Sequence, residues 1–135
     1  MAQNEAALAI NWDADIAQSE RGVSFGKNMI VRTLVSVNVF LTLASFGLLG
    51  FFIRPTSGLL VLHYNVYFGV EIQGLWWQVF ILPLASAIFL LGHLSLAWRF
   101  YSQSERIAAY LMLLGSCLIS IGILIASGSI AFINY

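Results

Sequence analysis

Residues 72–98 read IQGLWWQVFILPLASAIFLLGHLSLAW and contain no Asp, Glu, Lys or Arg. Two further stretches share this property, Thr33–Ile53 before it and Ile107–Tyr135 after it. Each is at least as long as the roughly 20 residues that a helix needs to cross about 30 Å of hydrocarbon. Backbone donors in lipid must be paired within the segment, and these stretches lack the alternation of barrel strands, so helices are expected. The sequence therefore predicts three transmembrane helices.

The composition agrees with a membrane protein. Of the 135 residues, 60% are hydrophobic and only 9% are charged, whereas about a quarter are charged in an ordinary soluble domain. The formal net charge is zero, so no basic field predicts a nucleic-acid partner. The single cysteine, Cys117, cannot form an intramolecular disulfide and is expected to serve packing. The N-terminal residues MAQNEAALAINWDAD lack the basic region of a cleavable signal peptide, so the first span is expected to remain as an anchor.

The basic residues near the span ends predict the orientation. Those that precede the first span or connect the last two are Arg21, Lys27, Arg32, Arg99 and Arg106, while Arg54 alone follows the first span. Because basic residues collect on the cytoplasmic side, the protein is expected in the cell membrane as a multi-pass protein. Its N-terminus and the turn near 99–106 are expected in the cytoplasm, and the loop near 54–74 and the C-terminus are expected outside.

The sequence divides into two parts. Residues 1–28 form a cytoplasmic or interfacial tail, in which AALAI and Trp12 predict either a short amphipathic helix on the membrane surface or a disordered segment. Residues 29–135 form a three-helix transmembrane domain with spans at about 33–53, 75–98 and 107–133. The turn SQSER predicts an antiparallel hairpin of the last two spans, with Ser102 or Ser104 capping a helix that begins near Glu105.

The outside loop has a different pattern. From Leu60 to Ile72, apolar residues alternate with His63, Asn65, Tyr67 and Glu71 among others, which is the period of a β-strand. This pattern predicts a strand or hairpin on the outer membrane surface. Its edges need a second strand through a turn near Asn65 or Gly69, another subunit or a peptide ligand, although an ordered connection without a ligand is the alternative. The predicted fold is an all-α membrane protein of three transmembrane helices with a short extended, β-like amphipathic segment in the loop between helices 1 and 2.

The candidate binding residues lie in this loop. They are His63, Tyr64, Asn65, Tyr67, Gly69 and Glu71. His63 and Glu71 are metal-ligand types, but in a fully extended strand they would lie more than about 25 Å apart. No metal site is therefore predicted.

Two polar residues, Asn38 and His93, lie inside the predicted spans, where polar side chains usually face the bundle interior. His93 is expected to form a hydrogen bond with Asn38 or Ser86 on a neighbouring helix; a haem ligand or a proton relay is the alternative. Pro83 is expected to kink the second span. The small residues of the third span, which favour close helix contact or a homo-oligomer interface, are Ser116, Ser120, Gly122, Ala126, Ser127 and Ala131.

The stretch RPTSGLLVLHYNVYFGVEIQGLWWQVFILP resembles a pattern in small uncharacterised bacterial membrane proteins, particularly of reduced-genome lineages. Its matching positions are His63, Tyr64, Asn65, Gly69, Glu71 and Pro83. More distantly, residues 50–135 are similar to the short membrane domain of SdpI-type proteins, which serve in peptide-toxin immunity and signalling, although that pattern has a longer multi-span body. The resemblance implies no catalytic residue and no cofactor.

Motifs of hydrolysis, phosphate binding and metalloprotease chemistry are absent from the sequence, so no enzyme activity is predicted. The favoured hypothesis is a non-enzymatic interaction, immunity or signalling component that contacts lipid and docks a membrane protein or peptide through the loop. Two alternatives stay open. One is a haem-binding anchor for electron transfer through His93, and the other is an oligomeric small transporter or channel component.

Overall fold

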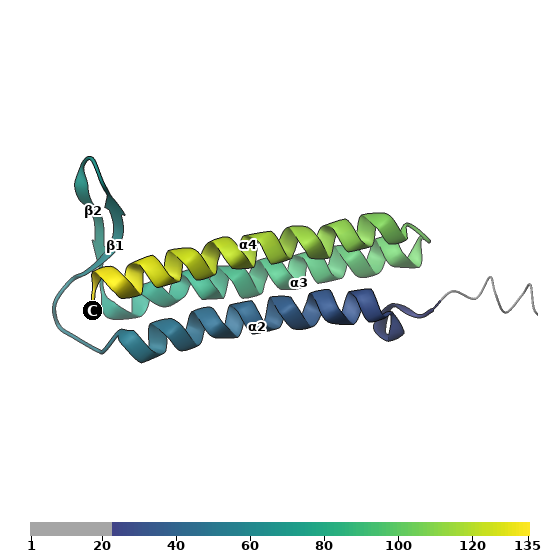
Figure 1. Ribbon diagram of the computed structural model, residues 1–135, viewed down its shortest axis with the longest axis horizontal. Helices are drawn as coiled ribbons and strands as arrows, with labels where there is room; N and C mark the ends of the chain where they lie inside the picture. The colour runs from purple at the N-terminus through teal and green to yellow at the C-terminus, as the bar shows by residue number, and fades with distance from the viewer. Residues whose placement is uncertain (1–22) are drawn as a thin grey trace, which may run out of the picture.

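The structure is a computed structural model that describes residues 23–135. Three long helices lie side by side (Figure 1): α2 (Met29–Phe52), α3 (Ile81–Ser102) and α4 (Arg106–Ile133). The short 3₁₀ helix η1 (Phe25–Lys27) precedes α2, and a second, η2 (Trp76–Phe80), leads directly into α3. All three long helices are long and apolar enough to cross a membrane, which agrees with the predicted helical architecture.

The beginning of the predicted tail is not part of this description. The amphipathic helix predicted around AALAI and Trp12, and the basic residue Arg21, lie outside the described residues. The end of the tail packs on α3, where the rings of Phe25 and Tyr101 meet edge to face with centroids 5.3 Å apart. The Tyr101 hydroxyl also donates a hydrogen bond of 2.5 Å to the carbonyl oxygen of Val23.

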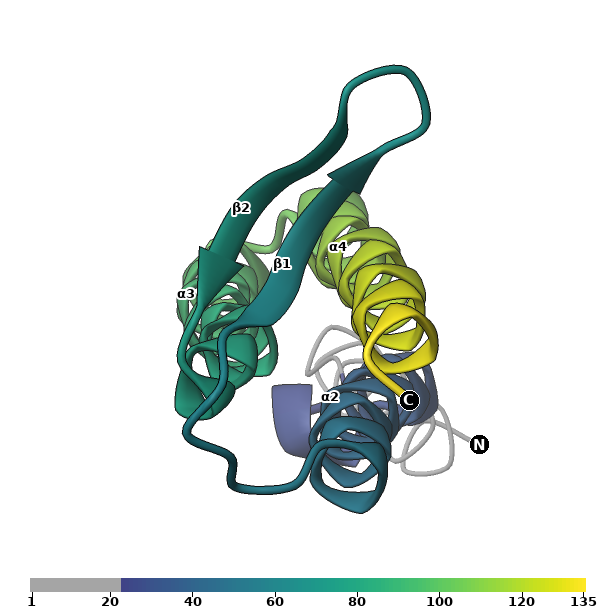
Figure 2. The same ribbon diagram turned by 90° about the vertical axis from the view of Figure 1, so that its left-hand side faces the viewer.

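Helix α4 packs along both other helices, whereas α2 and α3 contact each other less. Seen along their axes, the three helices occupy the corners of a triangle (Figure 2). Buried apolar residues gather at its two ends. The cluster near the α3–α4 turn contains Val31, Ala97, Ala109 and Leu113, and the cluster at the opposite end contains Leu49, Ile53, Val79, Ile130 and Ala131. Small and polar side chains fill the middle of the bundle between these clusters.

The outer surface of the bundle is apolar along the middle of the helices. Large exposed side chains there include Phe40, Leu43, Ile88, Leu91, Leu118 and Ile125. Phe40 is 69% exposed and Ile125 is 66% exposed, so these side chains point away from the bundle. The bundle therefore buries a group of polar residues and presents a mostly apolar outer surface, the reverse of a water-soluble helical bundle.

The turn between α3 and α4 shows that the predicted serine cap of the third span is wrong. Ser104 has a φ of 66°, the left-handed conformation that ends a helix. Its N–H donates to the carbonyl oxygen of Tyr101, and the next N–H, that of Glu105, donates to Phe100, which together form a Schellman motif. Ser102 instead donates its hydroxyl to Trp98. Neither serine caps α4, because both positions are needed to end α3.

The loop after α2 contains a β-hairpin. Strand β1 (Leu60–Asn65) pairs antiparallel with β2 (Gly69–Gly74), so the turn falls between Asn65 and Gly69, one of the possibilities that the sequence left open. The side-chain oxygen of Asn65 accepts the N–H of Tyr67 at 2.9 Å. Gly69 has a φ of 79°, the left-handed conformation that closes a three-residue hairpin loop and that glycine adopts without a steric cost.

Pro83 lies near the start of the second span. It is the third residue of α3, directly after η2, and its side chain is buried. The N–H groups of a helix's first turn have no partner within that α-helix, so a proline there removes none of its internal hydrogen bonds. Pro83 therefore stands in the first turn of α3 without removing a hydrogen bond of that helix.

Candidate functional site

The base of the hairpin is fastened to the end of α4 by Asn134. The side-chain amide of Asn134 donates to the carbonyl oxygen of Val61 at 2.8 Å, and its oxygen accepts the Val61 N–H at 2.8 Å. The same amide donates to the carbonyl oxygen of Ile130 at 2.9 Å. Asn134 thus satisfies one donor and one acceptor of β1 in the manner of a neighbouring strand. Asn134 is not among the residues predicted from the sequence, because nothing in the local pattern links it to a segment 73 positions away.

The end of β2 is held by a close contact at Gly74. Gly74 is buried, and a Cβ at this position would lie 2.1 Å from the side-chain oxygen of Gln78 and 2.5 Å from a methyl carbon of Leu62. That Gln78 oxygen accepts the N–H of Leu75 at 2.7 Å. Leu60 and Leu62 of β1 pack on the apolar cluster at the same end of the bundle. The hairpin therefore has a rigid base on the helices.

The chain reversal brings His63 and Glu71 together. His63 Nε2 lies 3.2 Å from Glu71 Oε2, and the two side chains are 58% and 38% exposed. The strand pairing shifts register on both sides of His63, a bulge-like irregularity of the kind that redirects side chains. Because both side chains are exposed, the pair contributes little to the free energy of unfolding. Among residues 23–135, no group of three His, Cys, Asp or Glu side chains is placed to hold a metal ion.

The other predicted loop residues lie at the turn of the hairpin or along its strands. Asn65 and Gly69 face each other and close the turn. Tyr64 is paired with Val70 and is half-exposed. Tyr67 lies in the turn itself and is 91% exposed, so it does not share one strand face with His63 and Glu71 as a single extended segment would require.

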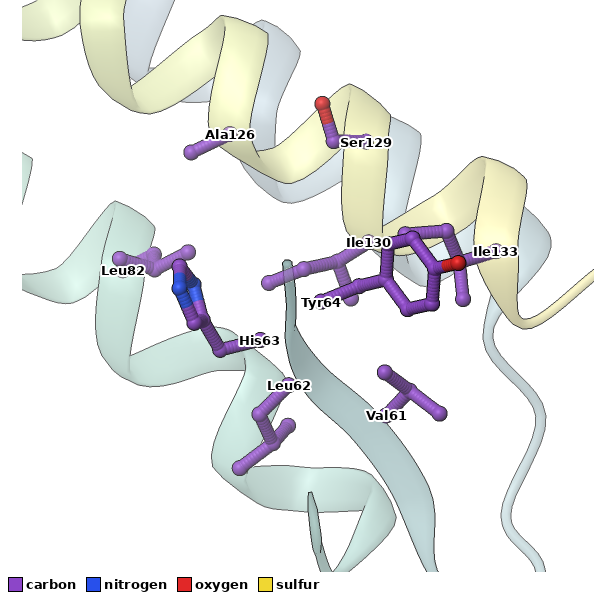
Figure 3. A pocket seen from close by; sticks show the side chains of 9 residues that line it. All are labelled: Val61, Leu62, His63, Tyr64, Leu82, Ala126, Ser129, Ile130 and Ile133. Atoms are coloured by element: carbon purple, nitrogen blue, oxygen red, sulfur yellow. The ribbon is translucent and has the colours of Figure 1, made fainter. Parts of the chain in front are cut away.

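A hollow lies between β1 and the helices (Figure 3). Its volume is about 350 Å³. The hairpin contributes Val61, Leu62, His63 and Tyr64, and the helices contribute Leu82 from α3 and Ala126, Ser129, Ile130 and Ile133 from α4. Apolar side chains form most of this lining, with the polar groups of His63, Tyr64 and Ser129 among them.

The predicted intramembrane residue Asn38 lies at the centre of a buried hydrogen-bond network. Its amide nitrogen contacts the Leu113 carbonyl oxygen at 3.3 Å and Cys117 Sγ at 2.9 Å, and its oxygen accepts the Ser120 hydroxyl at 3.1 Å. Ser120 in turn meets Ser86 at 3.1 Å, and Ser86 meets Thr42 at 2.9 Å. The network joins all three helices, and its members satisfy one another without an external ligand.

His93 stands apart from this network, so its predicted bond to Asn38 or Ser86 is wrong. Its Nδ1 lies 2.8 Å from the carbonyl oxygen of Phe89, one turn earlier in the same helix. Its ring lies beside that of Phe89, with centroids 6.4 Å apart, and Phe89 is half-exposed on the outer surface. The physical reason is that Asn38 and Ser86 are already bonded to α4 and to Thr42, on the inner side of the bundle.

The chain matches no protein-family model, no curated protein and no solved structure. Function must therefore be inferred from the geometry of the chain itself. Within the described residues, that geometry offers a rigidly based hairpin with an exposed polar pair, an exposed tip and an adjoining hollow.

Proposed function

We propose that this chain is a non-enzymatic integral membrane protein whose β-hairpin docks another membrane protein or a peptide on the outer side of the membrane. The observation that carries this proposal is the contrast within the hairpin. Asn134 and the apolar cluster fix its base, while the strand pair beyond the base exposes His63 and Glu71. A rigid, exposed strand pair is a common way to present a recognition surface to a partner.

The distribution of polar and apolar side chains supports membrane insertion. Exposed residues such as Phe40 and Leu43 would each face water at a cost of about 1.5–3 kcal/mol relative to burial, whereas lipid accommodates them. The buried network around Asn38 has the interhelical hydrogen bonds that hold membrane helices together.

The charges support the orientation. Lys27, Arg32, Arg99 and Arg106 lie at the end of the bundle with the α3–α4 turn, whereas Arg54 lies at the hairpin end. Because cytoplasmic segments carry the excess of basic residues, the hairpin and the C-terminus belong outside and the α3–α4 turn belongs in the cytoplasm.

The docking proposal is tested by purifying the full chain from native membranes and identifying co-purifying proteins. The test variant carries His63→Ala, Asn65→Ala and Glu71→Ala, and the matched control carries Thr56→Ala, Ser57→Ala and Gln73→Ala at the same end of the molecule. A partner that is retained by the wild type and the control but lost from the test variant is the expected result. Identical partners for both variants would contradict docking through the hairpin.

A further inference from the structure

The direction of the hairpin relative to the helices has a consequence for the membrane. The two strands run across the helix axes instead of along them (Figure 1). Viewed along the helices, the hairpin passes over the ends of α3 and α4, and its turn projects beyond α4 (Figure 2). If the helices cross a bilayer, the hairpin lies parallel to its surface, and the projecting part lies over lipid.

The projecting part is apolar. Its turn consists of Val66, Tyr67 and Phe68, which are 83%, 91% and 79% exposed. Tyr64, Val70 and Ile72 continue this surface along the strands and are about half-exposed. Such a cluster is unfavourable in water and marks a surface that another apolar phase covers.

The surroundings identify lipid as that phase. Trp77 and Tyr135 are exposed at the same end of the bundle, and tryptophan and tyrosine are enriched where a membrane meets water. The hollow beside β1 lies between the hairpin and the helices α3 and α4 (Figure 3). Apolar side chains such as Leu82, Ala126 and Ile130 form most of its lining and can contact a lipid chain, with the polar groups of His63, Tyr64 and Ser129 among them.

We propose that the distal half of the hairpin, residues 64–72, is a lipid-binding element that lies in the outer interfacial layer of the bilayer beside α4. This inference rests on the proposed membrane insertion. In this arrangement the exposed turn residues Val66, Tyr67 and Phe68 contact the lipid, and the exposed His63–Glu71 pair stays available to the protein partner. No Lys or Arg occurs between Arg54 and Arg99, so the attraction comes from apolar area and does not require anionic lipid.

The test measures the depth of the tip with an environment-sensitive fluorophore attached to single cysteines. Phe68→Cys reports the tip, Ser57→Cys reports the exposed loop at the same end, and Leu43→Cys reports the middle of α2, each in a Cys117→Ser background. The labelled full chains are placed in phosphatidylcholine nanodiscs, whose two faces are both accessible. Quenching is measured with aqueous iodide and with lipids that carry a nitroxide either near the headgroup or at the middle of the acyl chain.

The expected result for position 68 is strong quenching by the shallow nitroxide and at least about threefold weaker iodide quenching than at position 57. The same result is expected when anionic lipid is added. Equal iodide quenching at positions 57 and 68 would overturn the proposal. Shielding from iodide without nitroxide quenching would also overturn it, because a second copy of the chain would then cover the tip. Failure of the mid-chain nitroxide to quench position 43 would instead refute membrane insertion itself.

Discussion

Asn134, the residue after α4, holds Val61 of the hairpin through two hydrogen bonds of 2.8 Å each. This pairing makes the end of the last helix the support for a strand that follows the first helix. The orientation of the hairpin, and with it the placement of its exposed half, depends on that support.

Replacing Asn134 with Ala should loosen the base of the hairpin. The substitution removes the side-chain groups that bond the Val61 N–H and C=O. These two half-buried backbone groups are left unpaired, at a local cost of about 1–3 kcal/mol. Hydrogen exchange of the β1 amides should therefore quicken while exchange in α2 stays unchanged. Tyr135→Ala, at an exposed neighbouring position, is the control. Unchanged exchange in β1 of the Asn134 variant would show that the two bonds do not hold the hairpin.

Replacing Asn38 with Leu should weaken the bundle. The variant leaves the Ser120 hydroxyl without its acceptor and removes the contacts with Leu113 and Cys117. Interhelical polar bonds in membranes contribute about 0.6 kcal/mol on average and up to about 1.7 kcal/mol, so a loss of about 1–2 kcal/mol is expected. Unfolding in a denaturing detergent measures this loss of the free energy of unfolding.

His93→Leu is the matched comparison for the Asn38 variant, since both remove a polar side chain from a predicted span. His93 bonds only its own helix among the residues that the structure describes, so its replacement should change the free energy of unfolding by less than about 0.5 kcal/mol. Equal losses of the free energy of unfolding for the two variants would contradict the assignment of the interhelical network to Asn38.

A non-enzymatic docking protein without haem should show no Soret absorption when the wild type is purified. A Soret band that the His93 variant lacks would favour the haem alternative.

Replacing Gly74 with Ala should disturb the junction of β2 and η2. The added methyl group would overlap the Gln78 oxygen and Leu62, and overpacking of this kind costs about 1–3 kcal/mol. Gly50→Ala provides the control, because its Cβ would meet no atom within 4 Å. A lower melting temperature in detergent is expected for the Gly74 variant alone. If both variants melt like the wild type, the hairpin base has room that the structure does not show.

Replacing Ser104 with Gly should stabilise the α3–α4 turn. A non-glycine residue in the left-handed conformation costs roughly 1–2 kcal/mol, part of which the greater freedom of glycine in the unfolded chain offsets. A net gain of about 0.5–1 kcal/mol is expected, measured as a higher melting temperature. Ser102→Gly, at the last residue of α3, should have the opposite effect. A destabilised Ser104 variant would contradict the Schellman assignment.

The helices and the hairpin turn were predictable because their signals are local. Three charge-free stretches indicate three long apolar helices, and Asn65 and Gly69 are residue types that hairpin turns favour. The turn after α3 shows how a local signal misleads. SQSER has the residues of a helix start, yet Ser104 is required to end the preceding helix, and that requirement decides its conformation.

The contacts that shape the candidate site were not predictable, because they join distant segments. His63 and Glu71 meet only after the chain reverses, and the bond of Asn134 to Val61 depends on the packing of α4 beneath β1. The predicted partner of His93 was wrong for a related reason. Sequence shows which residues are polar within a span, but the rotation of each helix decides that Asn38 faces inward and His93 lies beside Phe89.

The most direct test of the central claim is cysteine labelling of intact cells with a membrane-impermeant maleimide. In a Cys117→Ser background, Ser57→Cys lies in the loop before the hairpin and Gln103→Cys lies in the α3–α4 turn, and both positions are exposed. A chain that crosses the membrane three times with the hairpin outside predicts labelling of position 57 in intact cells and of position 103 only after permeabilisation. Labelling of position 57 only after permeabilisation, with position 103 labelled from outside, would contradict the orientation and the docking surface together.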